Sequence, residues 1–100
     1  MSEDYRQHVV RDLRLVILKE LTHQPAYTLN EVILQKVAAS FGHNRTRDAI
    51  RNELRYLADV GAVHLVEEAG YMIATLSRRG QDHVQGLAEI EGVARPTPKE

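Results

Sequence analysis

Residues 46–77 read TRDAIRNELRYLADVGAVHLVEEAGYMIATLS. The first part predicts a helix that carries a ladder of arginines and ends at Gly61. Two β-rich runs follow at residues 63–67 and 71–75, and the Glu68-Ala-Gly70 segment between them is typical of a tight hairpin turn. Ser77 is suited to cap a further helix. The stretch therefore predicts a helix, a two-stranded hairpin and another helix, in that order.

Two more helices are predicted before this stretch. Apolar residues recur at helical spacing in residues 4–21, and Pro25 requires that helix to end before it. Thr28-Leu-Asn-Glu31 reads as a capping box for a helix over residues 29–41. We expect this second helix to bury a stripe formed by Leu29, Val32, Ile33, Val37 and Phe41.

The third helix is predicted over residues 45–60, with Asn44 as its N-cap. Only residues 42–44 connect it to the second helix, and so short a link is typical of a helix-turn-helix corner. Its expected core side chains are Ile50, Leu54, Leu57 and Ala58.

The end of the chain predicts a fourth helix over residues 78–91 and then a flexible tail over residues 92–100, which contain two prolines and no apolar period. The sequence thus predicts one domain, residues 1–91. It is mainly α with a two-stranded β-hairpin, in the order helix-helix-helix-strand-strand-helix.

The composition excludes several classes of protein. The chain has 100 residues, a formal net charge of −1 and no cysteine. Disulfides, thiolate metal sites and a cysteine nucleophile are therefore excluded, and we expect a reducing, cytoplasmic location. The longest apolar run is residues 15–18 and the N-terminal residues are charged, so neither a membrane span nor a signal peptide is predicted. Nucleic-acid binding gains no support from this net charge and must depend on local patches.

Two patterns resemble a known family. Leu54-Arg-Tyr-Leu57-Ala-Asp-Val-Gly61-Ala-Val63 is similar to the end of the recognition helix in winged helix-turn-helix regulators of the MarR, ArsR and PadR type. Thr75-Leu-Ser-Arg-Arg-Gly80 is similar to the segment that closes the wing of these proteins and opens their last helix. The ending Gly92-Val-Ala-Arg-Pro96 also resembles small winged-helix proteins of Mu-like prophages. The resemblance implies a winged-helix fold and DNA binding.

The third helix also supports DNA binding on chemical grounds. With Ile50, Leu54 and Leu57 turned inward, its outer face presents arginine and asparagine side chains. These side chains can form paired hydrogen bonds with guanine and adenine in the major groove, and the helix N-terminus can hold a phosphate. The resemblance places groove contacts at residues 47, 48, 51 and 52. The full set expected to contact DNA is Asn44, Arg45, Thr46, Arg47, Asp48, Arg51, Asn52, Arg55, Arg78 and Arg79.

The hairpin tip departs from the family pattern. Many winged helices carry basic residues there, whereas this tip is Glu67-Glu68-Ala-Gly70, which repels phosphate. Two functions therefore stay open. One is a sequence-specific DNA-binding protein, a small bacterial or prophage transcriptional regulator that reads the major groove with residues 45–60. The other is a protein-interaction winged helix, such as a phage accessory or assembly protein, that does not bind DNA.

No enzyme, cofactor or metal site is predicted. The five histidines are scattered without metal-ligand spacing, and the sequence contains neither a glycine-rich phosphate loop nor a catalytic set of side chains. No small-molecule ligand is evident. The expected partners are double-stranded DNA and a second copy of the chain, since the apolar faces of helices 4–21 and 78–91 suit either the core or a homodimer seam.

Overall fold

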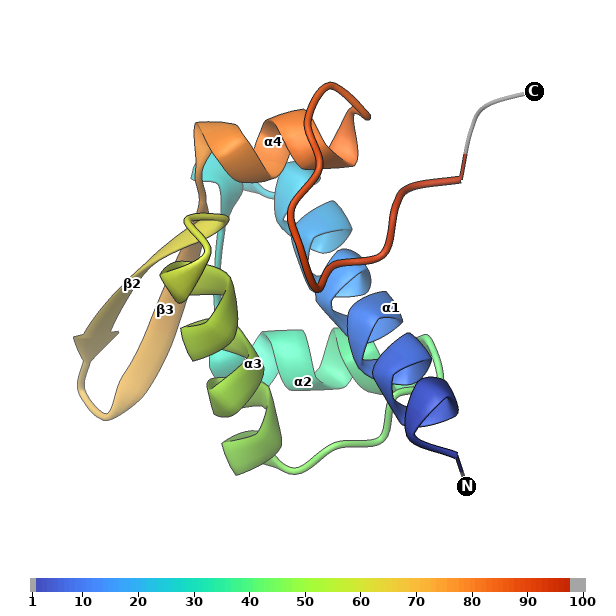
Figure 1. Cartoon of the computed structure of the whole chain (residues 1–100). Coiled ribbons are helices and arrows are strands. Elements are labelled where there is room, and N and C mark those ends of the chain that lie inside the picture. Colours follow the sequence, from blue (N-terminus) through green and yellow to red (C-terminus); the bar gives the residue numbers. More distant parts are fainter. Residues whose placement is uncertain (1, 98–100) are drawn as a thin grey trace.

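The computed structural model of the chain describes residues 2–97, which form four α-helices and a three-stranded antiparallel sheet (Figure 1). The helices are α1 (Glu3–Thr22), α2 (Glu31–Ser40), α3 (Arg47–Asp59) and α4 (Arg78–Val84). The strands are β1 (Thr28–Asn30), β2 (Val63–Glu68) and β3 (Tyr71–Leu76), and a short 3-10 turn, η1 (Pro25–Tyr27), precedes β1. The chain is thus mainly α-helical with a small sheet, and its helices and hairpin follow the predicted order.

The sheet contains one strand more than predicted. β3 lies in the centre, between β1 and β2, so the prediction of a two-stranded hairpin alone is wrong. Thr28 pairs with Thr75, and their hydroxyl groups lie 2.9 Å apart. β1 has only three residues, too few to show the alternation by which strands are recognised. Its extended conformation depends on pairing with a strand far along the chain.

The hairpin of β2 and β3 turns through two residues. Ala69 and Gly70 have φ values of 51° and 83°, as a two-residue primed turn requires. The turn closes on the Glu68–Tyr71 pair, and the ladder continues to Val63 and Leu76.

One hydrophobic core lies between the helices and one face of the sheet. Buried residues alternate along β3, so the other face of the sheet is turned to solvent. α1 and α3 supply the most deeply buried leucines, including the predicted Leu54 and Leu57. The buried apolar side chains are Leu13, Leu15, Ile17, Leu18, Leu21, Leu34, Ala38, Ile50, Leu54, Leu57, Ala62, Val63, Met72, Ala74, Leu76, Ile90 and Val93.

The start of α2 differs from the prediction. The N-cap is Asn30, whose side-chain oxygen accepts hydrogen bonds from two amides of the first turn. The predicted capping box is wrong because pairing with β3 draws Thr28 into the sheet. Glu31, which was expected to close that box, is buried instead.

The buried stripe of α2 is also rotated from the predicted one. Leu34 and Ala38 face the core, whereas Ile33 is 39% exposed and Phe41 is 63% exposed. The spacing of residues 31, 34 and 38 places them on one helix face, so the burial of Glu31 and the burial of the two apolar side chains go together.

α3 begins two residues later than predicted. Its N-cap is Thr46, whose hydroxyl oxygen accepts a hydrogen bond from the Ala49 amide at 3.1 Å. Asn44 stays in the link, so its predicted capping role is wrong. Arg45 also precedes the helix, and its carbonyl oxygen accepts a hydrogen bond from the Gln35 side chain at 2.9 Å. That bond holds the link against α2.

α4 is shorter than predicted. Ser77 caps it as expected, with its hydroxyl oxygen accepting from the Gly80 amide at 3.0 Å. The helix ends at Val84 rather than at residue 91. Gly86 follows with a φ of 79°, a left-handed conformation that commonly ends helices.

An irregular segment after α4 returns to α1 and packs there (Figure 1). Ile90 and Val93 enter the core with 1% and 5% of their surface exposed. The Ala94 amide donates to the Arg11 carbonyl oxygen at 3.1 Å, and the His83 ring accepts from the Ile90 amide at 3.0 Å. The packed part of the chain thus continues beyond the predicted boundary at residue 91. Residues 98–100 of the predicted tail lie outside the described residues.

Within residues 2–97, no helix combines the length and the apolar character needed to cross a membrane.

Candidate nucleic-acid interface

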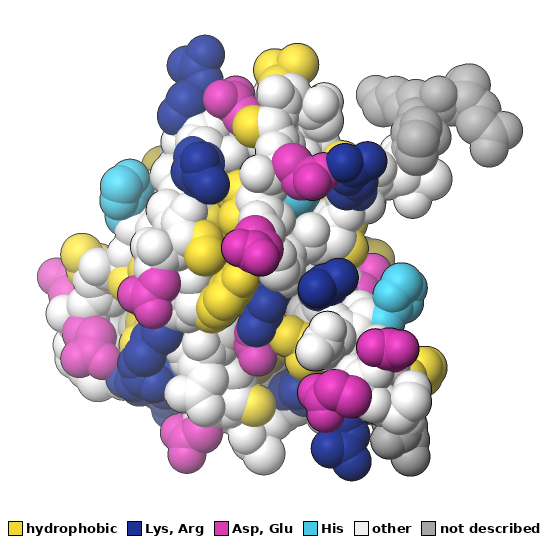
Figure 2. All heavy atoms as spheres, in the orientation of Figure 1, with side chains coloured by type: hydrophobic (Ala, Val, Ile, Leu, Met, Phe, Trp, Pro, Cys, Tyr) yellow, Lys and Arg dark blue, Asp and Glu magenta, His cyan; other side chains and the backbone are white. Residues whose placement is uncertain are grey.

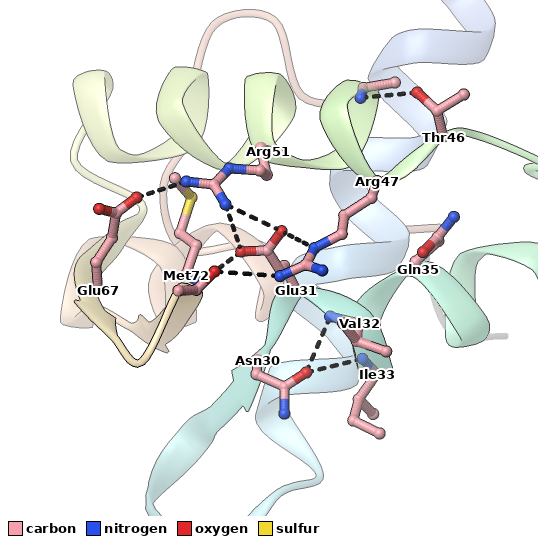
Figure 3. Close-up of polar contacts among 12 residues, drawn as sticks. Asn30, Glu31, Val32, Ile33, Gln35, Thr46, Arg47, Arg51, Glu67 and Met72 are labelled. Atoms are coloured by element: carbon pink, nitrogen blue, oxygen red, sulfur yellow. Dashed lines mark hydrogen bonds and ion pairs between the residues drawn. The ribbon is translucent and has the colours of Figure 1, made fainter.

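A buried carboxylate organises several of the residues predicted to contact DNA (Figure 3). The side chain of Glu31, the first residue of α2, has no exposed surface. Its Oε1 accepts a hydrogen bond from Arg47 Nε at 2.6 Å. Its Oε2 accepts from Arg51 Nη1 at 3.1 Å and from the Met72 amide at 2.5 Å. This one carboxylate therefore joins α2, α3 and β3.

Both arginines also reach the hairpin. Arg51 Nη2 donates to Glu67 Oε1 on β2 at 2.5 Å. Arg47 Nη2 donates to the Gly70 carbonyl oxygen at 3.1 Å. The Arg47 guanidinium carbon lies 4.9 Å from the centre of the Tyr71 ring, within the range of a cation–π interaction. The N-terminal half of α3 is thus attached to the hairpin through two side chains.

The ion pairs keep Glu31 in its charged form. Burial raises the pKa of this carboxyl, but the hydrogen bonds from Arg47 and Met72 and the charges of the two arginines together outweigh burial. The pKa of Glu31 therefore lies below its ordinary value of 4.5. The hydrogen bond to Glu31 in turn raises the pKa of Arg47 above its ordinary value. Glu31, Arg47, Arg51 and Glu67 form one group of two basic and two acidic side chains, the Glu31 cluster.

The helical period predicted that Arg51 lies on the outer face of α3, but the structure turns this side chain toward the hairpin. Its side chain is only 20% exposed, and its two terminal nitrogens contact carboxylates. Arg47 is 43% exposed, with Nε and Nη2 engaged. The guanidinium groups turn toward the hairpin because a buried carboxylate lies at the start of α2, and the helical period of α3 contains no information about that carboxylate. Both side chains consequently hold the fold together.

Among the other residues of α3 predicted to contact DNA, Asp48, Asn52 and Arg55 are exposed. Arg55 Nη1 donates to Asn52 Oδ1 at 3.0 Å. Within residues 2–97, no other hydrogen bond engages either of these two side chains. The structure therefore brings an asparagine and an arginine together on the solvent side of α3, one turn apart.

The two remaining predicted arginines lie elsewhere. Arg78 and Arg79 begin α4, at the end of the hairpin away from its turn. Arg79 Nε donates to the Val60 carbonyl oxygen at 2.9 Å, and Arg78 pairs with Asp82 at 3.5 Å. Arg79 thus contacts the C-cap of α3, and neither arginine takes part in the ion pairs of the Glu31 cluster.

Charges of both signs are interspersed on the face of the molecule that Figure 2 shows. Basic and acidic side chains alternate there without a broad patch of one sign, in keeping with the net charge of −1. Within residues 2–97, no group of three or more histidine, aspartate or glutamate side chains is arranged to hold a metal ion.

Comparison with known proteins places the chain among relatives with a bacteriophage member. It is 38% identical over 91 residues to the protein gp26 of Escherichia phage Mu, a match that covers 91% of this chain and 94% of gp26. The chain belongs to the gp26 family. A protein of Haemophilus influenzae is 30% identical over 76 residues, covering 75% of this chain and 74% of that protein. Both relatives are described as uncharacterised. No family model and no solved structure matches the chain.

The central residue of this site, Glu31, was not among the residues predicted from sequence. The sequence offers two possible N-caps for α2, Thr28 and Asn30, and choosing Asn30 could have revealed the role of Glu31. A cap at Asn30 makes Glu31 the first residue of the helix, where its side chain cannot close a capping box and is available for other partners.

Proposed function

We propose that this gp26-family chain is a small winged-helix protein that binds double-stranded DNA and regulates transcription in a phage or its bacterial host. In this proposal α2 and α3 are the helix-turn-helix, and α3 is the recognition helix that enters the major groove. The hairpin of β2 and β3 is the wing, and β1 completes its sheet. The observation that carries the proposal is the exposed pair of Asn52 and Arg55 on a helix whose position is fixed by Glu31.

The outer face of α3 has side chains of the types that read base edges. Asparagine binds the N6 and N7 positions of adenine, and arginine binds O6 and N7 of guanine, each through two hydrogen bonds. Asn52 and Arg55 are exposed and, in this proposal, exchange their mutual hydrogen bond for contacts to bases. Thr46 and the first amides of α3 provide a place for a phosphate.

The Glu31 cluster supports the proposal through preorganisation. A free arginine side chain has about 2 kcal/mol of rotamer entropy to lose when it is ordered. Arg47 is already ordered by Glu31, Gly70 and Tyr71, yet 43% of its side chain remains exposed between α3 and the hairpin. A phosphate contact by Arg47 would therefore require little additional ordering.

The acidic wing tip shapes the expected mode of binding. Glu67 and Glu68 repel phosphate, and the charges of Arg47 and Arg51 are partly offset by Glu31 and Glu67. We expect weak binding to random duplexes and a larger contribution from base contacts than in a strongly basic domain. The salt dependence should correspond to few neutralised phosphates.

Selection of binding sites from a pool of random duplexes tests this proposal. We expect one sequence to be enriched, and we expect Arg55→Ala to weaken binding to it by about 5- to 150-fold, the equivalent of one lost bidentate contact. Arg6→Ala is the matched control because Arg6 is an exposed arginine on α1. Its effect should stay within about threefold. If no duplex is enriched, or if Arg55→Ala binds as the parent does, the groove assignment is wrong.

One observation favours a second candidate, a winged-helix module that binds protein. The guanidinium groups expected to face DNA are instead paired with Glu31 and Glu67, and the wing tip is acidic. A chain that binds no duplex even at low salt would make this second candidate the leading function.

A further inference from the structure

β2 has a backbone edge that is free for another strand. It pairs with β3 on one side only and lies at the margin of the sheet (Figure 1). Because the two-residue turn closes on the Glu68–Tyr71 pair, alternate backbone groups of β2 point outward, those of Val63, Leu65 and Glu67. Within residues 2–97, no backbone hydrogen bond from outside the sheet reaches them. An unpaired edge of this kind is a template for strand addition.

The exposed side chains of β2 are apolar in the middle and ionisable on either side. Val66 is 58% exposed and lies opposite Ile73. His64 and Glu68, two residues before and after it, are exposed on the same face. Neither forms an ion pair within residues 2–97. An apolar centre with an imidazole on one side and a carboxylate on the other can match a second copy of itself, because an imidazole N–H can donate a hydrogen bond to a carboxylate.

We infer that two copies of this chain associate through β2, paired antiparallel about Val66. In this register Val66 meets Val66 of the second copy, and His64 meets Glu68 twice, because a twofold axis repeats the contact. The outward backbone groups of Leu65 then face those of Glu67, which suits the alternation of an antiparallel ladder. The result is one continuous sheet made of both three-stranded sheets.

The neighbouring registers fit less well. Pairing about Leu65 places His64 opposite Val66, so its ring and the Glu68 carboxylate both lose their partners. Pairing about Glu67 brings two carboxylates together, and like charges directly opposite each other destabilise a sheet. If one strand slides by a single residue along the other, outward backbone groups of one copy face inward groups of the other, and no ladder forms. Among these registers, pairing about Val66 satisfies the backbone and the side chains together.

The contact is short, so the dimer should be weak and reversible. One strand of six residues from each copy gives an interface at the small end of specific contacts. The twofold axis would be perpendicular to the sheet, so α3 of both copies would lie on the same face of the joined sheet. The inference concerns association of the chain with itself and does not depend on DNA binding.

Sedimentation equilibrium of the full chain, from about 10 μM to about 1 mM, tests this inference. The weight-average mass is expected to rise with concentration from 11.3 kDa toward twice that value. Glu68→Lys and His64→Glu should each weaken association about 5- to 10-fold, because each replaces a complementary pair by a like-charged or unmatched one twice per dimer. The double variant His64→Glu/Glu68→Lys should restore association.

The control is Glu91→Lys, which makes the same change in charge at an exposed position outside the sheet and should leave the mass curve unchanged. All the substituted side chains are exposed, and circular dichroism of each variant checks its fold. A mass of 11.3 kDa at every concentration would overturn the inference. A dimer that the single substitutions leave intact, or that the double variant does not restore, would also overturn it, because association would then use another surface.

Discussion

Replacing Glu31 by glutamine should destabilise the chain strongly although the side chain keeps its shape. The glutamine amide group would face either Arg47 Nε or the Arg51 and Met72 donors, and a donor cannot accept their hydrogen bonds. Removing one partner of a buried ion pair costs about 3–5 kcal/mol. Because Arg47 and Arg51 are partly exposed and Arg51 keeps Glu67, we expect a smaller loss, about 2–3 kcal/mol. For a domain of this size that loss lowers Tm by about 10–20 °C.

Urea unfolding at pH 7, followed by circular dichroism, measures this difference. Glu67→Gln is the matched control, because it removes another carboxylate of the same cluster from a side chain that is 60% exposed. The expected loss for this exposed pair is below about 1 kcal/mol. If Glu31→Gln unfolds within about 0.5 kcal/mol of the parent, the carboxylate does not stabilise the fold and our reading of the cluster is refuted.

Three further predictions concern stability. The pKa of Glu31 is lower in the folded chain than its ordinary value of 4.5, so its contribution to the free energy of unfolding should be complete above that value and disappear as the pH falls through the folded pKa. In urea unfolding between pH 7 and pH 2, the free energy of unfolding should therefore decrease less for Glu31→Gln than for the parent. Gly80→Ala should cost about 1–3 kcal/mol in thermal unfolding, because the added Cβ would lie 2.4 Å from the Ala62 carbonyl oxygen; an unchanged Tm would contradict that close approach. Ile90→Ala should cost about 2–5 kcal/mol because the side chain is 1% exposed, whereas Leu87→Ala, at a position 73% exposed, should stay within about 0.5 kcal/mol; equal stability of the two variants would show that the segment after α4 is not part of the core.

The sequence predicted the elements whose signals are local. The turn between β2 and β3, the Ser77 cap and the leucine stripe of α3 each depend on residues within a few positions of one another. Errors arose where a distant partner decides the conformation. Thr28 is an acceptable cap by its side chain, but pairing with Thr75 makes it part of a strand. The fourth helix was predicted to reach residue 91, whereas it ends at Val84, Gly86 takes a left-handed conformation, and Ile90 is buried from an irregular segment.

The candidate site was predicted only in part for the same reason. A helical wheel gives the angular position of Arg47 and Arg51 but not the direction of their long side chains. That direction depends on Glu31, whose partners Arg47, Arg51 and Met72 are 16, 20 and 41 residues away along the chain. Local sequence patterns do not predict contacts between residues so far apart in the chain. Asn52 and Arg55 bond within α3 and lie on its exposed side, as predicted.

A nuclear magnetic resonance titration tests most directly whether α3 is the surface that contacts DNA, as proposed. Amide resonances of the ¹⁵N-labelled chain would be followed at low salt while a short duplex is added. We expect the largest shifts in the segment from Arg45 to Arg55, smaller shifts in the hairpin and none along the exposed face of α1. An unchanged spectrum, or shifts concentrated away from α3, would contradict the claim.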